Sequence, residues 1–175
     1  MVKEVKYRII KALDNIEIRH YDKFIIAKVD GYGDGGFNLL FDFISGNNSS
    51  KSNLEMTSPV ISRNIDMTAP VLSEKESIAF VMPEEYTLEN TPTPNDKRVR
   101  IEEIPERNIA VLKFSGRWTS SNFEEKSEQL LRQLKKLEIQ TKGNLFSMRY
   151  NGPLTPWFLR RNEVAIEIKN IRNNY

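Results

Sequence analysis

The two halves of this chain repeat one another in outline. Three stretches match at one constant offset: Arg100-Ile101-Glu102-Glu103 with Glu17-Ile18-Arg19-His20, Ile109-Ala110 with Ile26-Ala27, and Gly116 with Gly33. A helix is predicted after the matched glycine in both halves. A duplicated set of strands with one helix favours a domain built from two similar parts related by a pseudo-twofold axis.

Local patterns predict the elements of the first half. Residues 7–13, 16–21 and 24–29 are rich in β-branched and aromatic residues, and turn formers separate them, so we expect a meander of hairpins. Apolar residues then recur at helical spacing, which predicts a short helix from about residue 36 to 45 that Gly46 terminates.

The second half is marked more clearly. Ser121 and Glu124 have capping-box spacing, and a single apolar stripe follows them and ends before Gly143. Strands are expected at residues 145–150 and 163–168. The predicted fold class is α+β: a pseudo-twofold pair of strand-helix-strand units that form a twisted, mainly antiparallel sheet or a distorted barrel with two helices.

A nine-residue phrase occurs twice in succession, at residues 54–62 and 65–73. Each copy has an acid, a methionine, a threonine, a small residue and a proline in the same order. If Arg63-Asn64 forms the turn, the copies pair as a hairpin. Pro59 and Pro70 each lack a ladder donor and therefore require an edge or a bulge.

Five motifs together resemble the SOUL/haem-binding protein family. They are the repeated phrase, Phe80-Val81-Met82-Pro83, Thr91-Pro92-Thr93-Pro94, the run at residues 110–116 and the closing Trp157-Phe158-Leu159-Arg160-Arg161-Asn162-Glu163-Val164. The resemblance covers nearly the whole chain. It implies a single α+β domain, here residues 1–170 with a tail at 171–175, that binds haem or another tetrapyrrole in a shallow apolar groove. The fold also resembles the GyrI-like effector-binding group.

Composition narrows the range of functions. Lysines and arginines number 26 against 24 acids, the net charge is +2, and no basic cluster stands out, which argues against nucleic acid as a partner. The chain has no cysteine, so disulfides and thiolate sites are excluded. It has no apolar run of signal-peptide or membrane-spanning length. We expect a cytoplasmic monomer without a membrane partner.

The first predicted helix carries more apolar surface than a surface helix needs. Phe37, Leu40, Phe41 and Ile44 fill one stripe, and Leu39 and Phe43 widen the apolar arc to roughly 200°, at about 100° per residue. The excess surface either packs as extra core beneath a loop or forms one wall of a ligand groove. Leu39 and Phe43 are therefore candidate ligand contacts.

A second candidate surface is the loop at residues 153–159, which is apolar where turns are normally polar. An apolar loop of this kind covers either a ligand or the core, so Trp157 and Phe158 are candidate contacts. Arg160 and Arg161 follow directly, and Arg63 lies at the tip of the repeated phrase. These arginines offer bidentate contacts to carboxylates such as haem propionates, or else form internal ion pairs with Glu163 or Asp66.

His20 is the single imidazole in the chain. It matches the position of a histidine proposed as axial haem ligand in one branch of the family, and the alternative is a solvent-facing side chain.

Tetrapyrrole-binding relatives carry basic residues on the first helix, where this chain has Asp34, Asn38, Leu39 and Asp42. These acids would repel propionates, which makes a less anionic ligand an alternative to haem.

Conventional catalysis finds little support. One histidine without cysteine leaves a carboxylate cluster as the only metal site, and neither a nucleophile elbow nor a phosphate loop is present. Some members of the effector-binding group hydrolyse small molecules through a groove glutamate, a role for which Glu102 and Glu103 are the candidates. Three functions therefore remain: a binding module for haem or another planar apolar ligand, a protein-interaction module, and a small-molecule hydrolase. We do not expect an enzyme.

Overall fold

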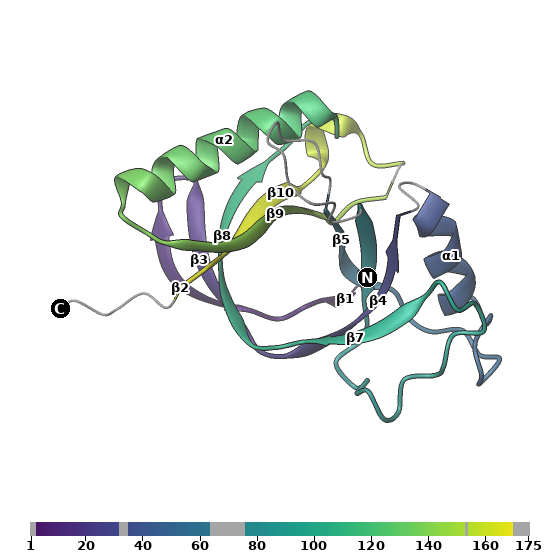
Figure 1. Cartoon of the computed structure of the whole chain (residues 1–175). Helices are drawn as coiled ribbons and strands as arrows, with labels where there is room; N and C mark the ends of the chain where they lie inside the picture. The colour runs from purple at the N-terminus through teal and green to yellow at the C-terminus, as the bar shows by residue number, and fades with distance from the viewer. Residues whose placement is uncertain (1–2, 32–34, 64–75, 153, 170–175) are drawn as a thin grey trace. The chain divides into compact units, whose positions relative to one another are not determined.

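The computed structural model describes residues 3–31, 35–63, 76–152 and 154–169. The chain divides into two compact units that interleave in sequence. The first unit comprises Met1–Val5 and Lys23–Pro105, and the second comprises Lys6–Asp22 and Glu106–Tyr175. Figure 1 shows the order of the elements along the chain.

The first unit is an antiparallel sheet with one helix. Its strands lie in the order β7-β4-β6-β5, and β1 pairs in parallel with β5. Helix α1 packs against β4 and β6. Figure 1 shows α1 beside β4. The elements are β1 (Lys3–Glu4), β4 (Phe24–Asp30), α1 (Gly35–Ile44), β5 (Thr57–Arg63), β6 (Ser77–Val81) and β7 (Arg100–Ile104).

The second unit has the same plan. Its strands lie in the order β2-β3-β8-β10-β9, all antiparallel, and helix α2 packs against β8, β9 and β10. The elements are β2 (Arg8–Leu13), β3 (Ile16–Tyr21), β8 (Arg107–Phe114), α2 (Ser120–Lys136), β9 (Thr141–Arg149), the 3₁₀ turn η1 (Trp157–Leu159) and β10 (Asn162–Ile168).

The sequence repeat and the strand pairing agree residue by residue. Glu17 on β3 pairs with Val111 on β8, and their matches Arg100 and Lys28 pair in the same way on β7 and β4. Strand β3, from the first half of the sequence, thus belongs to the sheet that packs against α2. Strand β7, from the second half, belongs to the sheet that packs against α1. This exchange explains why each unit is discontinuous in sequence.

Each unit has its own apolar core beneath its helix. In the first unit Val29, Leu40, Phe43 and Phe80 are buried together; in the second, Ile18, Leu112, Leu130 and Val164 form the corresponding set. Burying one such side chain contributes roughly 1.5–3 kcal/mol to stability. The helices are therefore held mainly by their apolar faces.

Several predicted elements are confirmed. Both helices form, α1 ends at Ile44, and Gly46 follows it with a φ of +110°, a conformation that favours glycine. Residues 8–13 and 16–21 form the expected hairpin. The register shift between Thr57 and Val60 confirms that Pro59 requires a bulge. The α+β class with a mainly antiparallel sheet is confirmed in both units.

Two local predictions were wrong. The meander does not continue from β3 to β4, because β3 pairs with β8 and β4 pairs with β6 and β7. The cap of α2 is Thr119, whose side chain accepts from the Asn122 amide, and not Ser121. Three successive hydroxyl residues compete for this role at residues 119–121. The second copy of the repeated phrase and the predicted tail lie outside the described residues.

Within the described part of the chain, no helix is both long enough and apolar enough to cross a membrane.

Candidate functional site

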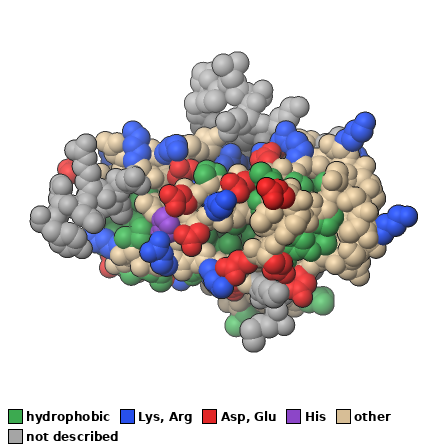
Figure 2. Space-filling model, turned by 90° about the horizontal axis from the view of Figure 1, so that it is seen from below, with side chains coloured by type: hydrophobic (Ala, Val, Ile, Leu, Met, Phe, Trp, Pro, Cys, Tyr) green, Lys and Arg blue, Asp and Glu red, His purple; other side chains and the backbone are tan. Residues whose placement is uncertain are grey.

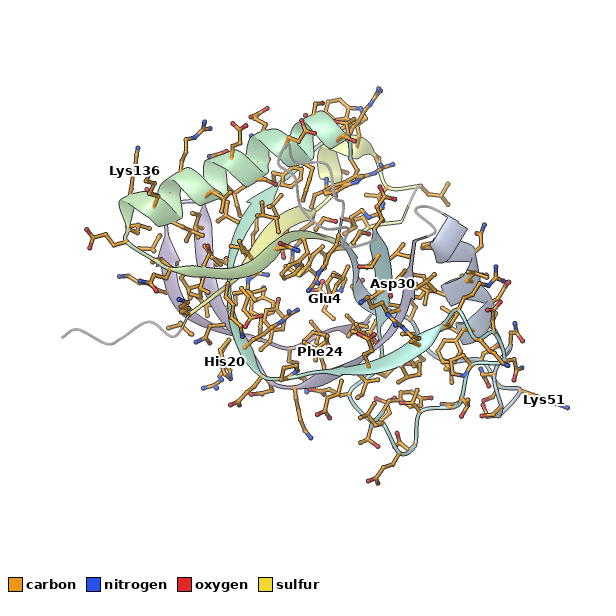
Figure 3. The ribbon with its side chains drawn as sticks, in the orientation of Figure 1. Glu4, His20, Phe24, Asp30, Lys51 and Lys136 are labelled. Atoms are coloured by element: carbon orange, nitrogen blue, oxygen red, sulfur yellow. The ribbon has the colours of Figure 1, made fainter. Side chains whose placement is uncertain are left out.

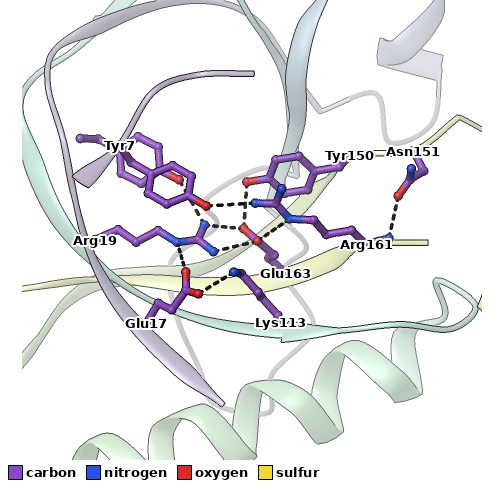
Figure 4. Close-up of polar contacts among 9 residues, drawn as sticks. Tyr7, Glu17, Arg19, Lys113, Tyr150, Asn151, Arg161 and Glu163 are labelled. Atoms are coloured by element: carbon purple, nitrogen blue, oxygen red, sulfur yellow. Dashed lines mark hydrogen bonds and ion pairs between the residues drawn. The ribbon is translucent and has the colours of Figure 1, made fainter. Parts of the chain in front are cut away.

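A buried polar cluster lies at the start of β10 in the second unit. Its centre is the pair formed by Arg19 on β3 and Glu163 on β10, whose side chains are both 0% exposed. The Arg19 Nη1 donates to Glu163 Oε2 at 2.7 Å and Nη2 donates to Oε1 at 2.9 Å (Figure 4). Both strands flank β8, so the topology of the sheet brings the two residues together.

The Glu163 carboxylate accepts from two further side chains. Tyr150 donates its hydroxyl to Oε2 at 2.8 Å, and Arg161 Nε donates to Oε1 at 2.9 Å. With the two bonds from Arg19, these contacts match the roughly four acceptor positions of a carboxylate. Glu163 therefore holds its neighbours in place, and its acceptor positions are already occupied.

Glu17 extends the cluster toward solvent. It accepts from Arg19 Nε at 2.8 Å and from Lys113 Nζ at 2.5 Å (Figure 4). Burial alone would raise the pKa of Glu17, but the hydrogen bonds from Lys113 and Arg19 lower it below its ordinary value. Arg19, Lys113 and Arg161 supply three cations against two carboxylates, so the cluster carries an excess of positive charge.

Tyrosines cover the cluster. The Tyr7 ring lies 4.2 Å from the Arg19 guanidinium, and the Tyr150 ring lies 3.8 Å from that of Arg161. Burial raises the pKa of Tyr21, and it raises the pKa of Tyr150 further, with Glu163 adding to the effect. These phenols therefore stay protonated, which suits them to donating hydrogen bonds and not to acting as nucleophiles.

The loop between β9 and β10 exposes several large apolar side chains. Four large side chains within six residues face solvent: Leu154 is 97% exposed, Trp157 50%, Phe158 58% and Leu159 65%. The Trp157 and Phe158 rings meet edge to face with centroids 5.6 Å apart. Contiguous exposed apolar residues of this kind mark interaction sites more often than single ones do.

Backbone hydrogen bonds hold this apolar loop. The Gly116 amide donates to the Trp157 carbonyl at 3.1 Å, and Asn162 Nδ2 donates to the Gly116 carbonyl at 3.0 Å. The Arg161 amide donates to Asn151 Oδ1 at 2.6 Å. The loop is thus fixed at its base while its side chains stay exposed, an arrangement that reduces the entropy lost on binding.

The arginines after the loop have internal partners. Arg161 forms the ion pair with Glu163 that was one of the two sequence-based alternatives. Arg160 is half-buried, and its Nε donates to the Thr155 carbonyl at 2.8 Å. Arg63, at the end of β5 in the first unit, is also half-buried. Arg161 therefore contributes to the loop's structure as well as to its charge.

His20 lies on β3 (Figure 3), and both of its ring nitrogens are engaged. Its Nδ1 is 2.8 Å from Asn108 Oδ1, and its Nε2 is 3.3 Å from Asp22 Oδ1. The side chain is 21% exposed, so it is not the open surface histidine of the sequence-based alternative. To bind an iron, Nε2 would have to leave Asp22.

The first helix exposes different residues from those predicted. Phe43 is 1% exposed and belongs to the core, so the expectation that it lines an open groove is wrong. Leu39 is half-buried against the same core. The exposed aromatics are instead Phe37 and Phe41, whose rings stack with centroids 6.4 Å apart. Leu39 and Phe43 widen the apolar face of α1 because they pack against the core between the helix and the sheet.

Sequence reasoning missed the roles of Arg19, Tyr7 and Tyr150, and it gave Glu163 only as an ion-pair partner of the neighbouring arginines. Arg19 stands in a strand beside the buried Ile18, and alternation predicts that it faces solvent. The sequence did offer one signal for a buried cluster, namely Arg161 and Glu163 at the start of β10. A charge inside an otherwise apolar strand requires a buried partner.

A surface hollow and the acidic side chains of the described residues add no further candidate site. A hollow of about 500 Å³ lies where α2 ends and β9 begins, and it contains none of the predicted site residues. Its walls are Leu131, Leu134, Lys135, Ile139, Gln140, Thr141 and Lys169. Among the described residues, no group of three or more histidine, cysteine or acidic side chains is placed to hold a metal ion.

Comparison with known proteins places the chain in a family. The sequence matches the SOUL heme-binding protein family over residues 2–167. The chain belongs to this family. The match confirms the resemblance seen in the five motifs. No individual curated protein matches the sequence significantly.

Solved structures with little sequence identity share the fold of this SOUL protein. The EcmrR C-terminal domain is 11% identical with a TM-score of 0.59, over 94% of this chain and 99% of that one. A hydrolase from Listeria innocua is 10% identical with a TM-score of 0.64, over 91% and 94%. An uncharacterized conserved protein from the same organism is 10% identical with a TM-score of 0.65, over 89% and 92%. Likeness at this identity shows the fold alone.

Proposed function

We propose that this SOUL protein is a binding module for haem, another tetrapyrrole or a similar planar apolar ligand. The observation that carries the proposal is the exposure of Leu154, Trp157, Phe158 and Leu159 on a loop with a fixed backbone. Membership of the SOUL family supports the same ligand class. A flat apolar ring would cover aromatic surface that water now contacts.

The physical gain from such contact is substantial. Covering apolar surface contributes about 25 cal/mol per Å², and aromatic stacking adds roughly 0.5–1.5 kcal/mol. Haem, when bound, supplies a planar ring, two carboxylates and an iron that accepts axial ligands. Trp157 and Phe158 suit the ring, and Arg160 lies next to them in sequence. His20 pairs with Asn108 at the start of β8, whereas Trp157 bonds to Gly116 just past the end of that strand, about eight residues or roughly 25 Å along the chain. We therefore propose His20 as an axial ligand only for a haem bound at its own end of β8, on condition that its contact with Asp22 opens.

Residues of the first unit are part of the proposal too. Leu39 and Arg63 are half-buried, and Phe37 and Phe41 give α1 an exposed aromatic face of its own. We propose that this face also contacts apolar ligands. Its contribution is tested separately, with Phe41→Ala.

The setting that we propose is a cytoplasmic monomer without nucleic acid or membrane as a partner. Acidic and basic side chains are interspersed on the face drawn in Figure 2. On this face the mixed charges give no basic stripe for phosphates, in line with the small net charge of +2, and we propose no nucleic-acid partner.

Two alternatives are less favoured. The apolar loop would also suit a protein partner, and ligand titration separates the two functions. A hydrolase would require a carboxylate ready to act on a substrate. Glu102 and Glu103 are each 36% exposed and pair with Lys28, Arg100 and Lys23, while the acceptor positions of Glu163 are occupied.

The experiment is a haem titration of the purified protein that follows the Soret band and tryptophan fluorescence. We expect saturable one-to-one binding that Trp157→Ala weakens at least tenfold, which corresponds to about 1.4 kcal/mol. Leu88→Ala is the matched control, because Leu88 is 54% exposed and lies on a loop of the first unit. A Soret band altered in His20→Ala would support axial ligation. Absence of saturable binding would contradict the proposal.

A further inference from the structure

Arg117 lies beside the exposed indole of the apolar loop. Its guanidinium carbon is 5.9 Å from the centroid of the Trp157 ring. The residue is exposed, and within the described ranges no carboxylate is found in an ion pair with it. An aromatic face with an exposed cation next to it presents two features that recognise a flat ring with an acidic substituent.

The chain is built so that Arg117 stays in this place. Gly116 precedes it with a φ of +123°, in the left-handed region that favours glycine. The Gly116 amide and carbonyl bond to Trp157 and Asn162 respectively. On the other side, Asn122 Nδ2 donates to the Arg117 carbonyl at 2.8 Å. The backbone of Arg117 and that of Trp157 are therefore tied together.

The neighbouring arginines are engaged elsewhere. Arg161 pairs with the buried Glu163, and the Arg160 Nε bonds to the Thr155 carbonyl. A ligand carboxylate that approached Arg161 would compete with a carboxylate already held in a buried cluster. Arg117 requires no such exchange.

We propose that Arg117 recognises the carboxylate of a planar ligand that contacts Trp157, and that the site prefers anionic aromatic compounds to cationic ones. This inference rests on the proposed function and names its ligand class more narrowly. It assigns the charge recognition to a residue of the second unit.

The test compares two porphyrins of opposite charge by fluorescence titration. Protoporphyrin IX carries two carboxylates and no iron, so axial ligation does not contribute; tetrakis(N-methylpyridyl)porphyrin carries positive charges. The variants are Arg117→Gln, Arg117→Lys and the control Arg132→Gln. Arg132 lies on α2 of the same unit, is 66% exposed and contacts Glu128.

We expect Arg117→Gln to weaken protoporphyrin IX binding about three- to tenfold, the range for one exposed charge-assisted contact. Arg117→Lys should recover part of this loss, and Arg132→Gln should change nothing. Affinity for the cationic porphyrin should not fall in Arg117→Gln. Saturable protoporphyrin IX binding that Arg117→Gln leaves unchanged would overturn the inference and leave the proposed function standing. No binding of protoporphyrin IX to the unaltered protein would contradict both.

Discussion

The two units place opposite charges at equivalent positions of the same sheet pattern. Arg19, Glu17 and Lys113 of the second unit correspond to Glu102, Arg100 and Asp30 of the first. In the first unit Arg100 contacts both Asp30 and Glu102, and Lys28 contacts the same two acids. Figure 3 marks Asp30 at the end of β4.

The difference between these networks is burial. The Arg19 side chain is 0% exposed, whereas its counterpart Glu102 is 36% exposed and Arg100 is 53% exposed. The position of Glu163 on β10 corresponds to Ser77 on β6, so the first unit has no central carboxylate there. The two units have the same strand register although the charges at equivalent positions are inverted. The backbone hydrogen bonds and the apolar core therefore set the register, and the charge pairs do not.

The largest effect is expected from removing the central carboxylate. Glu163→Gln leaves the buried Arg19 and the half-buried Arg161 against a neutral amide, so we expect it to lower the free energy of unfolding by about 3–5 kcal/mol. Urea denaturation followed by circular dichroism measures this. Glu102→Gln, on the half-exposed network of the first unit, is the matched comparison. Equal losses in the two variants would mean that burial does not separate the networks.

A smaller loss is expected when both partners of the buried pair are removed. Arg19→Met combined with Glu163→Leu removes both fully buried charges between β3 and β10 together. The double variant should therefore be more stable than the sum of its single variants implies, by about 2 kcal/mol. A double-mutant cycle in urea measures the coupling. Strict additivity would show that the two side chains do not interact.

The exposed network should contribute little. Arg100→Met should change the free energy of unfolding by no more than about 1 kcal/mol, because surface ion pairs are screened by solvent and salt. The same denaturation assay at low and high salt checks this. A loss as large as that of Glu163→Gln would reverse the comparison.

The smallest effect is a pH dependence. The pKa of Glu17 is lower in the folded protein than in the unfolded chain, so the folded protein binds fewer protons at this residue. The ionised Glu17 therefore stabilises the fold above about pH 4.3, the ordinary glutamate value. This stabilisation is lost as the pH falls through the lower pKa of the folded state. Lys113→Met removes one cause of the shift. We expect stability to fall less steeply with acid in this variant, by about 0.5 kcal/mol or less. Identical acid slopes would contradict the assignment.

Much of the fold could be predicted because the signals are local. Helical periodicity located both helices, and Gly46 marked the end of the first. The repeat at constant offset predicted equivalent elements, which the shared register confirms. Pairing of β3 with β8 and of β7 with β4 could not be predicted, because the partner of a strand depends on residues far away in sequence.

The candidate site was harder to predict for a related reason. The apolar character of residues 154–159 is visible in sequence, but whether Trp157 faces solvent or core depends on the fold. Arg19 carries no local sign of burial, since its partners Tyr7 and Glu163 come from opposite ends of the chain. Phe43 was misplaced because helical spacing alone does not show how wide a sheet the helix must cover.

The central claim is that the buried cluster serves stability while the exposed loop serves binding. Haem affinity and the free energy of unfolding, measured side by side on Trp157→Ala, test it most directly. The account predicts at least a tenfold loss of haem affinity with stability unchanged to within about 0.5 kcal/mol, the usual range for surface substitutions. Unchanged affinity, or a loss of affinity explained by partial unfolding, would contradict it.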